Sequence, residues 1–61
     1  MIYVIEYGEN IETLRNLFQD FQQAQIFAKQ LIALSNDEYE AIGPNQWYCQ
    51  AKKEYVKIEG N

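Results

Sequence analysis

Residues 20–34 read DFQQAQIFAKQLIAL, and this stretch decides how the rest of the chain can fold. Asp20 and Gln23 have the spacing of a capping box, in which the carboxylate accepts a hydrogen bond from the backbone N–H three residues later. Beyond the cap, apolar residues recur at three- and four-residue steps: Ala24, Phe27, Ala28, Leu31 and Leu34. This periodicity predicts one helix with a single apolar stripe, and the two alanines favour close packing on a sheet. The polar run at residues 35–37 ends the helix.

After the helix, apolar residues alternate with a period of two. Residues 39–42 and 47–51 are predicted strands, joined by a turn at residues 43–46 in which Pro and Asn occupy the central positions. If Ile42 pairs with Trp47, one face of this predicted hairpin carries Ile42, Trp47, Cys49 and Ala51. The other face then carries Tyr39, Ala41, Tyr48 and Gln50. A turn at residues 52–54 and a last strand at residues 55–59 follow; extension of the preceding strand through the lysines is the alternative.

The N-terminal segment allows two interpretations. Residues 2–7 are β-branched and aromatic and predict a strand. Residues 11–18 either form a second strand after a turn at residues 8–10, or continue the helical stripe backward. We favour the strand, because a capping signal inside an uninterrupted helix has no role. The predicted class is α+β, with a small antiparallel sheet packed on one principal helix. The preferred order is β-β-α-β-β with one further strand possible, and β-α-β-β with a longer helix is the alternative.

Composition restricts the function more than any motif does. The chain has 61 residues, no histidine, one cysteine and a formal net charge of −4, which indicates a single small domain at residues 1–61. Cys49 has no base to activate its thiol and is expected in the core. No catalytic, cofactor-binding or metal-binding residues are predicted, and the protein is not expected to be an enzyme. Without a signal or a long apolar run, we expect a cytoplasmic protein that does not enter a membrane.

The two faces of the predicted sheet differ in composition. The face toward the helix is expected to carry Ile2, Val4, Ile42, Trp47, Cys49, Val56 and Ile58. The opposite face is then expected to carry Tyr3, Ile5, Tyr7, Tyr39, Tyr48 and Tyr55. Because tyrosine offers apolar area with a polar tip, this second face is a candidate partner-binding surface. Reversed faces in the first strand are the alternative, and they would bury Tyr3, Ile5 and Tyr7.

These features predict a small non-enzymatic, protein-binding or self-associating accessory domain. Its expected partner is another protein or a second copy of the chain. The alternative is a nucleic-acid-related module: either a weak single-strand binder that stacks bases on the rings, or an acidic mimic of nucleic acid. In that case, the side chains that contact phosphate would be Arg15, Lys52, Lys53 and Lys57. The acidic net charge opposes phosphate binding, so nucleic acid is the less favoured partner.

Overall fold

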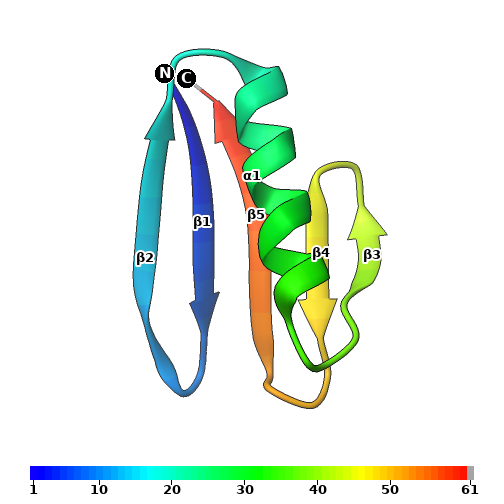
Figure 1. The fold of residues 1–61 in the computed structure, drawn as a ribbon. Helices are drawn as coiled ribbons and strands as arrows, with labels where there is room; N and C mark the ends of the chain where they lie inside the picture. The colour runs from blue at the N-terminus through cyan, green and yellow to red at the C-terminus, as the bar shows by residue number, and fades with distance from the viewer. Residues whose placement is uncertain (61) are drawn as a thin grey trace.

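The computed structural model describes residues 1–60 as one open sheet with a helix across one face (Figure 1). The elements are β1 (Ile2–Gly8), β2 (Ile11–Phe18), α1 (Phe21–Leu34), β3 (Glu40–Gly43), β4 (Gln46–Cys49) and β5 (Glu54–Gly60). All strand pairs are antiparallel, and the strands lie in the order β2-β1-β5-β4-β3. The α+β class and the β-β-α-β-β-β order are confirmed. The single long helix starting before Asp20 is wrong, because residues 11–18 pair with β1.

The helix begins and ends where the local sequence indicates. Asp20 is the N-cap, and its carboxylate accepts a hydrogen bond from the Gln23 backbone N–H at 2.8 Å. At the other end, the backbone N–H of Ser35 donates to the Ile32 carbonyl oxygen at 3.2 Å. Ala24 and Ala28 are fully buried. Their small side chains let the helix lie directly on the two central strands of the sheet, as expected.

We expect the Asp20→Ala substitution to lower the free energy of unfolding by about 1 kcal/mol, because it removes the acceptor for one otherwise unpaired N–H at the helix start. Asp20→Asn keeps a side-chain oxygen and is the matched control, with a much smaller effect. Urea denaturation followed by circular dichroism measures both. Equal losses in the two variants would contradict a capping role.

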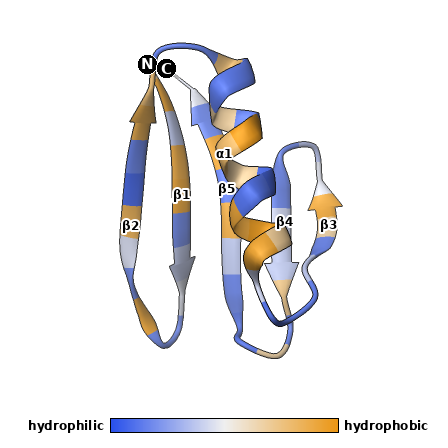
Figure 2. Cartoon of the chain, in the orientation of Figure 1, coloured by the Kyte–Doolittle hydropathy of each residue, from blue (hydrophilic) through white to orange (hydrophobic). Residues whose placement is uncertain are grey.

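The pairing of β1 with both β2 and β5 places the N-terminal strand inside the sheet. Ile5 lies opposite Arg15 of β2 and opposite Lys57 of β5. The last strand is separate from β4, because residues 50–53 form the connecting turn and Lys53 adopts a left-handed backbone conformation with φ 56°. Extension of β4 through the lysines is therefore wrong. Figure 2 shows hydrophobic and hydrophilic segments interspersed along β1 and β2, without strict alternation.

One predicted pairing is wrong. Asn45 has a positive φ of 62°, and Gly43 pairs with Gln46 across the expected turn. The register then shifts between Ala41 and Gly43, so that Ala41, and not Ile42, lies opposite Trp47. An extra residue in one strand reverses the faces of the residues that precede it. Ile42 is consequently exposed rather than in the core.

The core is small and lies between the helix and the centre of the sheet. Val4 and Val56 are buried against the two helix alanines, and the half-buried side chains around them include Trp47 and Ile58, as expected. Cys49 is fully buried, whereas Ala51 lies in the turn after β4 and is exposed, contrary to the prediction. Among residues 1–60 no helix has the length and apolar character needed to cross a bilayer.

Candidate functional site

The sheet face opposite the helix carries a row of three tyrosines, one from each of three neighbouring strands. Tyr55 of β5 lies opposite Tyr7 of β1 on one side and opposite Tyr48 of β4 on the other. The Tyr7 and Tyr55 rings are stacked, with centroids 4.9 Å apart and planes within 10°. The Tyr48 and Tyr55 centroids are 4.6 Å apart with a tilt of 37°. Tyr55 is therefore enclosed between two other rings, and we call these three residues the tyrosine row.

A second row beside the first combines an apolar centre with two cations. Arg15, Ile5 and Lys57 lie side by side on β2, β1 and β5. Ile5 is only 5% exposed although no helix covers this face. The Lys57 ammonium lies 5.3 Å from the centre of the Tyr7 ring and 3.1 Å from a Glu59 carboxylate oxygen. Long side chains thus shield the isoleucine, with their apolar stems against the sheet and their charges toward water.

The remaining two predicted surface residues lie in different places. Tyr3 is half-buried on the open face, between Leu17 of β2 and Glu59 of β5. Tyr39 packs against the core on the helix side, so its predicted position on the open face is wrong. The register shift in β3 is the cause. Burial, followed by the carboxylate of Glu54, raises the pKa of the Tyr39 phenol; the structure therefore assigns it to packing.

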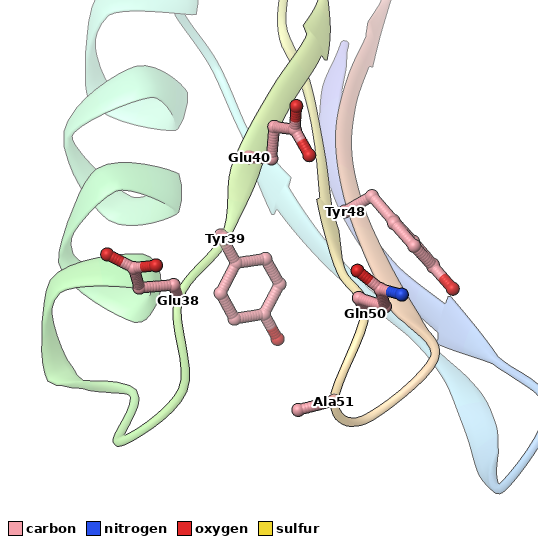
Figure 3. Close-up of a pocket in the computed structure, with 6 residues that line it drawn as sticks. All are labelled: Glu38, Tyr39, Glu40, Tyr48, Gln50 and Ala51. Carbon is pink, nitrogen blue, oxygen red and sulfur yellow. The ribbon is translucent and has the colours of Figure 1, made fainter.

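Each end of the tyrosine row borders an open hollow. One, of about 240 Å³, is lined by Ile5, Tyr7, Thr13, Arg15, Lys57 and Glu59. The other, of about 590 Å³, is lined by Glu38, Tyr39, Glu40, Tyr48, Gln50 and Ala51, which Figure 3 shows at the end of β3 and β4. Two cations and the Glu59 carboxylate line the first hollow, whereas two carboxylates and no cation line the second. The open face is therefore electrically polarised from its β2 side to its β3 side.

The groups that this face presents are aromatic rings, phenolic hydroxyl groups and charged side chains. The Cys49 thiol is fully buried on the other side of the sheet, and the chain has no histidine to activate it. Within residues 1–60, no three metal-ligating side chains are grouped together. Apolar ring area, phenolic hydroxyl groups and separated charges are what interfaces between proteins use.

The sequence suggested Arg15 only as a phosphate contact and did not place it beside Ile5. Its alternation with Thr13 and Leu17 was a usable signal for its face, but its contact with Ile5 depends on the pairing of β1 with β2. In the described part of the chain, residues 1–60, Arg15 forms no ion pair, in contrast to Lys57. A free guanidinium beside a buried isoleucine is the feature of this face that most clearly offers a charge to another molecule.

Comparison with protein-family models, with curated proteins and with solved structures gave no match to this chain.

Proposed function

We propose that this protein is a small non-catalytic domain that binds another protein through the open face of its sheet. The occupant is an extended or loop segment that carries a carboxylate and at least one apolar or aromatic side chain. The observation that carries this proposal is the ordered tyrosine row beside the hollow in which Arg15 is free of an ion pair. Rings that are already fixed by their neighbours lose little conformational freedom on binding, so their area converts efficiently into affinity.

The geometry of the rings favours a protein partner over a nucleic acid. A base stacks on an aromatic side chain only when one face of the ring is free. In the tyrosine row, Tyr55 is enclosed by rings on both sides, and Tyr7 has Tyr55 stacked on it and Lys57 near it. Side chains arranged in this way offer their edges and hydroxyl groups, which suit hydrogen bonds and apolar contacts from a peptide.

The charges of the face specify the orientation of the partner. A carboxylate placed in the smaller hollow lies beside Arg15, which has no ion pair, and beside Lys57, which already pairs with Glu59. Glu38 and Glu40 at the other end of the face attract a basic residue. The chain as a whole carries a net charge of −4, so an acidic segment is repelled by most of the surface and attracted here. Such patterning contributes to specificity and to the rate of encounter.

Selection from a display library of random linear peptides, with the wild-type protein as the target, tests this function. Enriched peptides are expected to contain acidic and aromatic residues. Arg15→Glu is expected to weaken their binding at least about tenfold, the size expected when an attractive charge pair becomes repulsive. Lys29→Glu is the matched control, because it makes the same change in net charge on the exposed side of the helix.

A second variant tests the tyrosine row itself. Tyr55→Ala removes the central ring and is expected to weaken the same peptides, provided that circular dichroism shows the fold intact. Equal binding by the wild type and Arg15→Glu, or equal loss in Arg15→Glu and Lys29→Glu, would contradict the proposed surface. Failure of any peptide to be enriched would also contradict it.

A further inference from the structure

The tyrosine row ends differently on its two sides. At the β1 end, the chain places one of its own cations against the last ring, because the Lys57 ammonium lies 5.3 Å from the centre of the Tyr7 ring. The same ammonium is 3.1 Å from a Glu59 carboxylate oxygen. A cation held by a ring and a carboxylate together is attracted by the negative face of the ring and by the opposite charge. The open face thus contains one complete group of ring, cation and carboxylate.

The β4 end of the row has a ring and a carboxylate in the same relation. Glu40 of β3 lies directly opposite Tyr48 of β4 and so continues the line of the three tyrosines onto the edge strand. Figure 3 shows the Glu40 and Tyr48 side chains pointing to the same side of the β3–β4 hairpin, as a directly opposed pair must. Tyr48 contacts the Tyr55 ring on one side, and it lines the larger hollow together with Glu40. The pair therefore faces an open space.

The larger hollow has no lysine or arginine in its lining. Lys52 follows Ala51 in the sequence, but its ammonium donates a hydrogen bond to the Ser35 hydroxyl oxygen at 3.0 Å. The same ammonium lies 6.0 Å from the centre of the Tyr39 ring. In the part of the chain that the structure describes, residues 1–60, Glu40 forms no ion pair. Its charge is consequently available to a cation from another molecule.

We propose that the larger hollow binds the guanidinium group of an arginine side chain, which stacks on the outer side of Tyr48 and pairs with the Glu40 carboxylate. This inference rests on the proposed function, because the arginine belongs to the segment bound at the open face. A guanidinium suits the hollow better than an ammonium, since it is planar, stacks on aromatic rings and directs several N–H donors in one plane. The Gln50 side chain, also in the lining, adds an amide oxygen as a further acceptor.

The positions of the two hollows determine the spacing of the groups that the partner must carry. Arg15 is on β2 and Glu40 is on β3, at the two edges of the five-stranded sheet. Four strand spacings separate these edges, which is about 19 Å. An extended segment advances about 3.3 Å per residue, so its acidic residue and its arginine are expected about six residues apart. A segment with this spacing crosses the strands and covers the tyrosine row.

Titration of the full chain with Nα-acetyl-arginine amide, followed by two-dimensional NMR at constant ionic strength, tests the hollow without a peptide. The corresponding citrulline amide is the matched control ligand, because a neutral urea group of similar shape replaces the guanidinium. Arginine amide is expected to produce saturable shifts at Glu40, Tyr48 and Gln50. The expected dissociation constant is on the order of 10 mM, as one cation–π contact and one exposed ion pair provide. Citrulline amide is expected to cause much smaller shifts.

Three variants separate the charge from the ring. Glu40→Gln and Tyr48→Leu are each expected to raise the dissociation constant of arginine amide at least about threefold. Glu12→Gln is the matched control for charge, since Glu12 is an exposed residue of the opposite edge strand. Tyr48→Phe keeps the aromatic ring. Both Glu12→Gln and Tyr48→Phe are expected to bind like the wild type.

Three results would overturn the guanidinium site: equal shifts with arginine and citrulline amides, equal binding by Glu40→Gln and the wild type, or tighter binding of Nα-acetyl-lysine amide. Failure of this site is distinguishable from failure of the proposed function. Selected peptides that bind without an arginine, and bind equally to Glu40→Gln, would overturn the site and leave the peptide-binding face supported. Saturable binding of arginine amide with no peptide enriched would support the site and contradict the proposed function.

Discussion

Replacing Gly8 with alanine is expected to lower the free energy of unfolding by about 2 kcal/mol, as a clash in a closely packed site does. A Cβ atom at this position would lie 2.6 Å from the Lys53 carbonyl oxygen and 3.0 Å from the Glu54 Cα atom. Both are backbone atoms, one in the last residue of the turn before β5 and one in the first residue of β5, and Gly8 pairs with Glu54 across the sheet. The methyl group therefore forces β1 and β5 apart at one end. Urea denaturation monitored by tryptophan fluorescence measures the loss.

Gly43→Ala is the matched control, since it makes the same chemical change at the end of another strand. A Cβ atom there would meet only the flexible Gln46 side chain, at 3.7 Å. Neither glycine has a positive φ, so the comparison measures space and not backbone strain. We expect the control to change stability by less than about 0.5 kcal/mol. Similar losses at the two positions would show that β1 and β5 are not in close contact beside Gly8.

The Ala28→Leu variant is expected to lose about 2 to 3 kcal/mol, the upper part of the range for an enlarged core residue. Ala28 is fully buried between the helix and the sheet and belongs to the same cluster as Val4 and Val56. Added carbons must displace either the helix or the central strands. In a domain of this size the loss is a large fraction of the total stability. In thermal denaturation, we expect a fraction of the Ala28→Leu protein to be unfolded already at room temperature.

Gln30→Leu controls for the change to leucine itself, because Gln30 lies on the exposed side of the same helix. Glutamine and leucine have similar helix propensities, so only a change at the surface remains. The midpoint temperature of thermal unfolding of Gln30→Leu is expected to stay close to that of the wild type. An Ala28→Leu variant as stable as this control would mean that the helix is not seated on the sheet through its alanines.

Local signals predicted the elements of this fold well. The Asp20 cap is recognisable from residues 20–23 alone. Because it fixes the start of the helix, it also led to the correct prediction that residues 11–18 are a strand. Alternation predicted the faces of β1, β4 and β5, including Val4, Trp47 and Val56 toward the helix. In these elements, propensity, capping and hydrophobic pattern all favour the same structure, and secondary structure can then be predicted from the sequence.

Nonlocal pairing explains what could not be predicted. The register shift near Ile42 depends on how β3 meets β4, and no residue type marks it in the sequence. Through that shift, Tyr39 moved to the helix side and out of the candidate surface. The burial of Ile5 likewise depends on its two cross-strand neighbours, Arg15 and Lys57. Alternation gives the face of a residue within its strand, but only the order of the strands gives its neighbours.

The edge strand β3 has four residues, an irregular register and Pro44 directly after it, and all three features oppose the addition of another strand. A sheet that accepts a new strand at both margins can add subunits without limit, which leads to fibrous growth. Here the short, irregular β3 edge with its proline opposes growth in one direction. A sheet that is obstructed at one edge cannot extend in both directions, so this feature opposes open-ended aggregation.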